Sequence, residues 1–139
     1  MRFFFYGTLM TGQDNPVTRA LCGKLSVGVP AVSVGALHAI GDEQGWYPVL
    51  VPGAGEVCGV VCEALATFDS ADLAAMDHWE GGEYCRAPIN ARLVSDGSTC
   101  EAEAYLYTAP LPKGAEPIPD GDFAAFLIRT GRRAFGTSL

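Results

Sequence analysis

The chain has 139 residues, of which 49% are hydrophobic and 18% are charged, and these proportions predict a single domain over residues 1–139 with a hydrophobic core. Its 9 basic and 16 acidic side chains leave a formal net charge of −7, which argues against nonspecific binding to nucleic acid or to an anionic membrane. Only Arg129, Arg132 and Arg133 cluster, and we assign them to the end of a helix, where cations are favourable.

The first predicted element is an apolar strand at residues 2–7 that runs into a turn of small residues. The turn consists of Tyr6, Gly7, Thr8 and Leu9. Glycine lets the backbone approach a ligand closely, and consecutive N–H groups at a strand end are suited to binding anions and oxyanions. We therefore interpret this turn as a candidate ligand-binding loop, the alternative being an ordinary turn after a core strand.

Extended segments dominate the next part of the chain. A polar turn at residues 11–15 and a short helix at 16–21 come first. Strands are then predicted at residues 27–40, 47–51 and 56–63, with turns at 41–45 and 52–55 between them. The glycines in the second turn lack the third glycine and the following helix of a dinucleotide-binding loop, so we reject that function.

A short helix follows at residues 69–80, and both of its ends are marked in the sequence. Asp69 is a favourable N-cap, and Asp72 places an acid in the first turn. Phe68 and Leu73 have the spacing of a hydrophobic staple. Two glycines directly after Glu80 end the helix, because glycine adopts the conformations that close a helix.

Glu80 is the candidate catalytic residue of this helix. At 100° per residue it shares one sector with Leu73, Met76 and Asp77, so its carboxylate is expected to point towards the core. Partial burial, the carbonyl groups of the helix end and the neighbouring acids Asp77 and Glu83 all raise a carboxyl pKa towards the range of a general base. The alternative is a solvated glutamate in a last helical turn.

The remaining elements complete an α+β pattern. Strands at residues 84–94 and 100–107 are joined by a turn containing Asp96 and Gly97, which predicts an antiparallel hairpin. A proline-rich extended connection leads to a closing helix at 121–130 with Phe123, Phe126 and Leu127 inward. Runs of strands with two or three helices and no regular alternation favour α+β.

The cysteines and the N-terminus both point to the cytoplasm. The five cysteines leave one unpaired and fit neither a zinc site nor a disulfide framework, so we expect reduced thiols and no metal. Cys85 is a rival nucleophile with His38 and His78 as conceivable partners, but no local feature pairs either histidine with it, and packing in a strand is favoured. The first apolar run is too short to span a bilayer and lacks a signal-peptide cleavage site.

The order of these motifs resembles the gamma-glutamylcyclotransferase-like superfamily, particularly its small bacterial members and the gamma-glutamylamine cyclotransferases. The matching residues, in chain order, are Tyr6, Gly7, Thr8 and Leu9, then Tyr47 and Pro48, then Asp77, His78, Trp79 and Glu80, and then Tyr84, Cys85 and Arg86. The resemblance covers nearly the whole chain, and it implies a small mixed, mostly antiparallel β-barrel with the Tyr6 loop and Glu80 at one opening.

The resemblance also implies an activity. The family's catalytic glutamate maps onto Glu80, and its substrate-cradling loop maps onto Tyr6, Gly7, Thr8 and Leu9. Tyr47 and Tyr84 are the expected pocket walls. Enzymes of this family let the alpha-amine of a gamma-glutamyl amide attack the side-chain carbonyl, which releases 5-oxoproline and a free amine without a cofactor. The expected partner is therefore a small gamma-glutamyl substrate.

Two alternative functions accompany this prediction. Instead of an active cyclotransferase, the chain is a noncatalytic module that binds a small amino-acid-like ligand in the same pocket. A protein-interaction domain would instead carry a large exposed apolar patch away from the pocket. Arg86 either offers its charge to a substrate carboxylate or pairs with Glu83 or another acid, and Trp46 belongs to the pocket or to the core.

Overall fold

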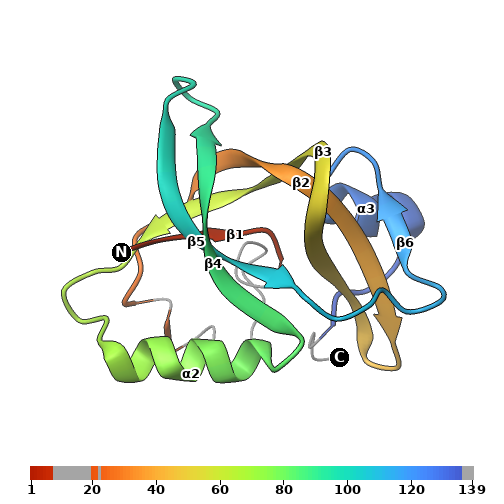
Figure 1. The fold of residues 1–139 in the computed structure, drawn as a ribbon, viewed down its shortest axis with the longest axis horizontal. Coiled ribbons are helices and arrows are strands. Elements are labelled where there is room, and N and C mark those ends of the chain that lie inside the picture. Colours follow the sequence, from red (N-terminus) through yellow and green to blue (C-terminus); the bar gives the residue numbers. More distant parts are fainter. Residues whose placement is uncertain (8–19, 22, 136–139) are drawn as a thin grey trace.

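The structure is a computed structural model that describes residues 1–7, 20–21 and 23–135. The strands and helices, which Figure 1 labels, are β1 (Arg2–Phe5), β2 (Val29–Asp42), β3 (Gly45–Glu63), α2 (Ser70–Glu80), β4 (Tyr84–Leu93), β5 (Thr99–Tyr107), β6 (Glu116–Ile118) and α3 (Phe123–Thr130). The predicted turn at 11–15 and nearly all of the predicted helix at 16–21 lie outside the described residues. Among the described residues, no helix is long and apolar enough to cross a membrane.

The strands close into a barrel. They are hydrogen-bonded in the order β3-β1-β5-β4-β2, and β2 pairs again with β3 to complete the circuit. The pairing of β1 with β5 is parallel, and the other pairings are antiparallel. The short strand β6 adds to the side of β2. The α+β class and the mixed, mostly antiparallel barrel expected from the sequence are confirmed.

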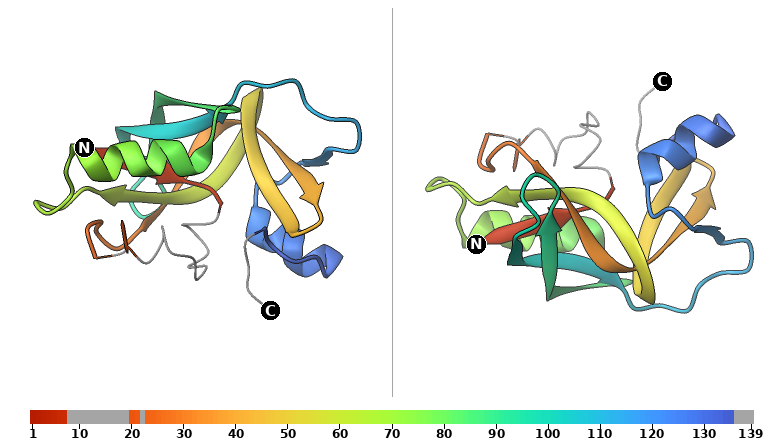
Figure 2. Two further views of the ribbon diagram at one scale, coloured as in Figure 1. Left: turned by 90° about the horizontal axis from the view of Figure 1, so that it is seen from below. Right: turned by 90° about the horizontal axis from the view of Figure 1, so that it is seen from above.

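After the exposed Arg2, strand β1 consists of three buried phenylalanines, because both of its faces are covered there. Phe4 points into the barrel, where it packs in a core that also contains small side chains such as Ala102 and Ala104. Phe3 and Phe5 point outward into a second cluster that includes Met76 of helix α2. Helix α2 therefore packs on the outside of the barrel over β1, and α3 lies at the other end of the molecule (Figure 2).

The sequence prediction of two strands at 47–51 and 56–63 was wrong, because β3 is one continuous strand. Its two halves pair with the two halves of β2, and the register shifts opposite Gly35. Residues 52–55 therefore form a bend at a corner of the barrel instead of a turn. Strand β6 was not predicted either, since it contains Pro117, which is tolerated in a short strand that adds to one side of β2.

Gly59 permits the close approach of β3 to β1. A Cβ atom there would lie 2.4 Å from the carbonyl oxygen of Phe5 and 2.7 Å from the Phe4 ring. The clash involves backbone, so it can be relieved only by separating the two strands. At Gly82, in contrast, an added Cβ would meet no atom within 4 Å.

We predict that Gly59→Ala lowers the free energy of unfolding by about 2–4 kcal/mol because overpacking here displaces barrel backbone. Urea denaturation monitored by circular dichroism measures this change. Gly82→Ala is the matched control, with an expected effect within about 0.5 kcal/mol. Equal midpoints for the two variants would contradict the packing described for β1 and β3.

Candidate active site

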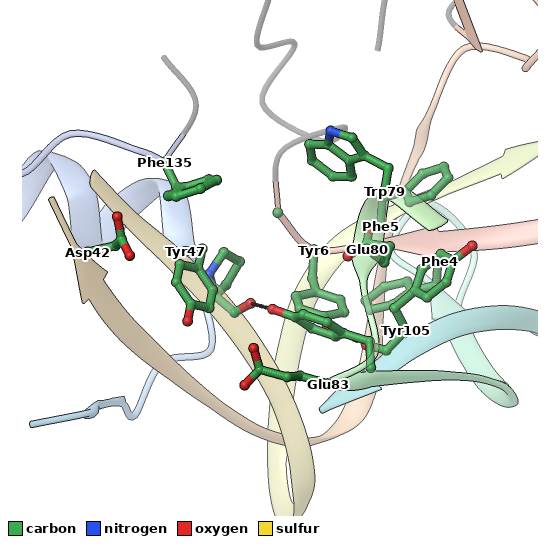
Figure 3. Close-up of a pocket in the computed structure, with 13 residues that line it drawn as sticks. Phe4, Phe5, Tyr6, Asp42, Tyr47, Trp79, Glu80, Glu83, Tyr105 and Phe135 are labelled. Atoms are coloured by element: carbon green, nitrogen blue, oxygen red, sulfur yellow. Dashed lines mark hydrogen bonds between the residues drawn. The ribbon is translucent and has the colours of Figure 1, made fainter. Parts of the chain in front are cut away.

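A pocket of about 380 Å³ opens where β1 leaves the barrel and helix α2 ends. Figure 3 shows the side chains that surround it. The described residues that line it are Phe4, Phe5, Tyr6, Gly7, Asp42, Tyr47, Pro48, Trp79, Glu80, Glu83, Tyr84, Tyr105 and Phe135. Most of these are aromatic, and the polar groups among them are few, which is typical of a small-molecule site.

Glu80 reaches the pocket from the last turn of α2. The helix begins with a reciprocal capping box, in which Asp69 accepts from the Asp72 N–H at 2.9 Å and Asp72 accepts from the Asp69 N–H at 3.0 Å. It ends at Gly81, whose N–H donates to the Asp77 carbonyl. Both ends agree with the sequence prediction, and they place Glu80 one turn beyond the buried Met76.

The carboxyl group of Glu80 is largely withdrawn from water. Burial and, to a smaller extent, the negative charge of Asp77 together raise its pKa from 4.5 to about 7. Burial is the larger cause, because a charged carboxylate is poorly stabilised away from solvent. At neutral pH the group is therefore divided between its ionised and protonated forms, which suits both the acceptance and the donation of a proton.

Asp77 holds helix α2 against the barrel. Its carboxylate accepts from Arg86 Nε at 2.9 Å and from the hydroxyl of Tyr105. Arg86 also donates to Glu103 at 3.0 Å. Arg86 is therefore paired with two acids, neither of which is the Glu83 considered in the sequence analysis, and it is absent from the described pocket lining.

The described part of the Tyr6 loop lies at the pocket, as expected. The Tyr6 hydroxyl donates to the carbonyl of Tyr105 on the parallel neighbour β5, and burial followed by the charge of Glu80 raises its pKa. Gly7 lies against Pro48, whose Cγ would be 2.8 Å from a Cβ atom added to Gly7. Thr8 and Leu9, the other two predicted loop residues, lie outside the described residues.

Tyr47 and Tyr84 form walls of the pocket, where the sequence analysis expected them. The Tyr84 hydroxyl donates to the Pro48 carbonyl at 3.2 Å, which links the start of β4 to β3. The Tyr47 ring packs edge-on against Phe135, with centroids 5.7 Å apart. Burial raises the pKa of both hydroxyl groups, so both remain neutral hydrogen-bonding groups at physiological pH.

Other lining residues were missed by the sequence analysis. Trp79 and Glu83 flank Glu80 in the sequence, so their proximity was a usable signal. Tyr105 and Phe135 come from distant segments, and only tertiary contacts bring them to the pocket. Asp42 lies at the end of β2, in the same hairpin as the predicted wall residue Tyr47. Trp46, left open between pocket and core, packs on Phe126 at 6.0 Å between ring centroids and is a core residue.

The rival nucleophile Cys85 finds no support in the described part of the chain. Cys85 is exposed on β4 and does not line the pocket. Its thiol contacts the carbonyl of Arg86. Among residues 1–7, 20–21 and 23–135, no group of three or more His, Cys, Asp or Glu side chains is arranged to hold a metal ion.

Comparison with known proteins identifies the family. The sequence matches the family described as gamma-glutamyl cyclotransferase, AIG2-like, over residues 3–125. The chain belongs to this family. The match includes every described lining residue except Phe135. Among curated proteins, no sequence matches this cyclotransferase-family chain.

Solved structures share its fold. The protein ytfP from Escherichia coli is 29% identical, with a TM-score of 0.60 over 88% of this chain and 96% of its own. The uncharacterized protein PH0828 from Pyrococcus horikoshii is 20% identical, with a TM-score of 0.66 over 94% of this chain and 96% of its own. A gamma-glutamyl cyclotransferase is 16% identical, with a TM-score of 0.62 over 99% of this chain and 89% of its own.

The raised pKa of Glu80 predicts a pH-dependent stability. The folded protein binds the Glu80 proton more tightly than the unfolded chain, so this group's contribution is fully present below pH 4.5 and is lost as the pH rises through about 7. The Glu80→Gln variant has no ionisable carboxyl group at this position, so it does not lose this stability as the pH rises. We expect the variant to gain roughly 2–3 kcal/mol relative to the wild type between pH 4 and pH 8.

Chemical denaturation at several pH values measures this difference. Glu43→Gln, at an exposed position in the β2–β3 turn, is the control for removing one negative charge. If the difference in the free energy of unfolding between the wild type and Glu80→Gln stays constant with pH, Glu80 is not held in a poorly solvated site.

Asp77→Asn tests the second cause of the raised pKa. Removing the neighbouring negative charge should lower the pKa of Glu80, because less repulsion opposes its ionisation. The titration of the Glu80 carboxyl carbon, followed by NMR, should move to lower pH. An unchanged or higher midpoint would show that Asp77 exerts no net electrostatic effect on Glu80.

Proposed function

We propose that this protein is a cyclotransferase that cleaves a gamma-glutamyl amide and releases 5-oxoproline together with a free amine or amino acid. The observation that carries the proposal is the position of Glu80, a carboxyl group with a pKa of about 7, in an aromatic pocket beside the exit of β1. Family membership supports the same reaction class. The proposed general base is thus ionised in part at neutral pH.

The proposed reaction does not require a covalent intermediate with the protein. The alpha-nitrogen of the glutamyl group attacks its own side-chain carbonyl carbon, so a carbon–nitrogen bond forms and closes the five-membered ring. The bond from that carbon to the departing amine then breaks. The nucleophile is part of the substrate, so the main task of the pocket is to hold the glutamyl chain folded.

Glu80 carries the proton between the two nitrogens. It accepts a proton from the attacking alpha-nitrogen and then donates it to the departing nitrogen, so the carboxyl group is restored at the end of each cycle. Its pKa of about 7 makes neither transfer strongly uphill. We assign stabilisation of the oxyanion to backbone N–H groups of the loop that begins at Tyr6 and Gly7.

The aromatic lining suits the folded substrate. The Tyr6 hydroxyl donates to the backbone carbonyl of Tyr105, the Tyr105 hydroxyl donates to Asp77, and the Tyr84 hydroxyl donates to the Pro48 carbonyl, so all three rings are held in place. A pocket of about 380 Å³ is adequate for a glutamyl group with part of its leaving group. The walls also reduce access of water, which favours ring closure over hydrolysis.

We predict that Glu80→Gln retains the fold but lowers the rate of cyclisation by at least about a hundredfold, because the amide cannot accept the proton. Purified protein is incubated with a panel of gamma-glutamyl amides, and 5-oxoproline is measured by mass spectrometry. Glu43→Gln is the matched control. Undiminished turnover by Glu80→Gln would remove Glu80 as the base, and substrate binding without any 5-oxoproline would favour a noncatalytic binding module.

A further inference from the structure

Four side chains beside helix α2 form a hydrogen-bonded cluster that has no step in the proposed reaction. They are Asp77 of α2, Arg86 of β4, and Glu103 and Tyr105 of β5. Arg86 and Tyr105 lie directly opposite each other in the β4–β5 ladder, and Glu103 lies two residues before Tyr105, on the same face of the strand. The register of the hairpin therefore brings all three strand residues to the side that faces Asp77.

Arg86 is the centre of this cluster. Its Nε lies 2.9 Å from Asp77 Oδ1, one terminal nitrogen lies 3.4 Å from Asp77 Oδ2, and the other lies 3.0 Å from Glu103 Oε1. A planar guanidinium is suited to this two-point contact with a carboxylate. Within the described part of the chain, Asp77 pairs with no other arginine or lysine. The positive charge that offsets Asp77 there comes from Arg86.

The cluster is partly shielded from water. The exposed fractions of the side chains are 24% for Arg86, 25% for Glu103 and 40% for Asp77. The second carboxylate oxygen of Glu103, Oε2, is buried and has no hydrogen-bond partner among the described residues. Charges in such surroundings act on one another more strongly than charges at the open surface. Loss of Arg86 would leave two partly buried carboxylates without this cation.

The cluster is connected to both parts of the proposed active site. Asp77 precedes Glu80 by three residues on the same helix, and its negative charge adds to burial in raising the pKa of Glu80. The Tyr105 hydroxyl donates to the same Asp77 oxygen as Arg86 Nε, and the Tyr105 carbonyl accepts from the Tyr6 hydroxyl. Figure 3 shows Tyr105 on the same side of the pocket as Glu80 and Tyr6. A change at Arg86 is therefore transmitted to Glu80 through Asp77.

The other titratable groups around Glu80 supply no positive charge from the pocket wall. The groups that line the pocket with it, or lie beside it on α2, are Tyr6, Tyr47, Tyr84, Tyr105, Asp42, Glu83 and His78. Burial raises the pKa of the four tyrosine hydroxyls, so they are neutral at physiological pH. His78 is exposed, and none of the described lining residues is Lys or Arg.

Resting on the proposed function, we propose that Arg86 is a positioning residue of this enzyme, which clamps Asp77 and offsets its charge so that enough of the Glu80 carboxyl is ionised at neutral pH to accept the proton. Arg86 does this from outside the described pocket lining and without touching the substrate. Asp77 opposes the ionisation of Glu80, and Arg86 limits that opposition.

Arg86→Gln tests the role of the charge, because the amide retains hydrogen-bond donors but is neutral. We expect the NMR titration midpoint of the Glu80 carboxyl carbon to rise by about 0.5–1 pH unit. The low-pH limb of kcat/KM for a gamma-glutamyl amide should move by the same amount. The value at pH 6 should therefore fall by about three- to tenfold and recover towards that of the wild type at pH 9, where Glu80 is ionised in both proteins.

Two single variants are compared with it. Arg86→Lys retains the positive charge beside Asp77 but not the planar fork, so the titration midpoint of Glu80 should stay within about 0.2 pH unit of the wild type. Arg92→Gln is the matched control, since Arg92 lies near the other end of β4 and pairs with the exposed Glu56 at 2.7 Å. It should change neither the midpoint nor the pH profile.

A double variant protects the test against misfolding. Arg86→Gln leaves Glu103 without its cation, and a buried carboxylate in that state is strongly destabilising. Combining Arg86→Gln with Glu103→Gln removes this acid as well, and Glu103→Gln alone is the reference. The two proteins differ only at Arg86, so the midpoint of Glu80 should be higher in the double variant than in the reference.

The outcomes separate this inference from the proposed function. Equal midpoints in Arg86→Gln and the wild type, or in the double variant and Glu103→Gln, overturn the inference. A loss of kcat/KM that is the same at every pH also overturns it, because that result assigns Arg86 to packing alone. The NMR titration needs no substrate. A raised midpoint together with no 5-oxoproline from the wild type therefore supports the effect of Arg86 on Glu80 and overturns the cyclotransferase proposal.

Discussion

The attachment of helix α2 to the barrel through Asp77 is the constraint on which the site depends. Arg86 from β4 and Tyr105 from β5 both donate to this one carboxylate. Glu80 follows Asp77 by three residues on the same helix, so the contacts that dock the helix also determine where Glu80 lies. The charge of Asp77 in turn opposes ionisation of Glu80, which couples the position of the proposed base to its pKa.

Two sets of acidic residues near the barrel and the pocket have different surroundings. Asp77 and Glu103 are paired with Arg86, and Glu116 is paired with Arg132, so these acids serve the packing of the barrel and its helices. Asp42 and Glu83 lack such partners within the described residues and line the pocket. The net negative charge is thus partly concentrated where a ligand would bind.

Features that depend on a few consecutive residues were predictable from the sequence. The Asp69 N-cap of α2, the hairpin of β4 and β5 and the closing helix were all expected, because each is specified by a few neighbouring residues. Predictions that required knowledge of distant strands were less successful. The continuity of β3 was missed because residues 52–55 resemble a turn locally, and only pairing with both halves of β2 keeps them within a strand.

The sequence by itself determined the helix that ends at Glu80, the inward direction of that side chain and the strand that leads into the Tyr6 loop, since capping and side-chain periodicity are local properties. Tertiary structure decided the rest of the pocket. Tyr105, Asp42 and Phe135 come from β5, the β2–β3 hairpin and the segment after α3. Barrel closure brings Tyr105 to Glu80 because it fixes strand register, and the backbone bond from Phe135 to Trp46 on β3 brings Phe135 to the pocket; both depend on contacts between segments far apart in the chain.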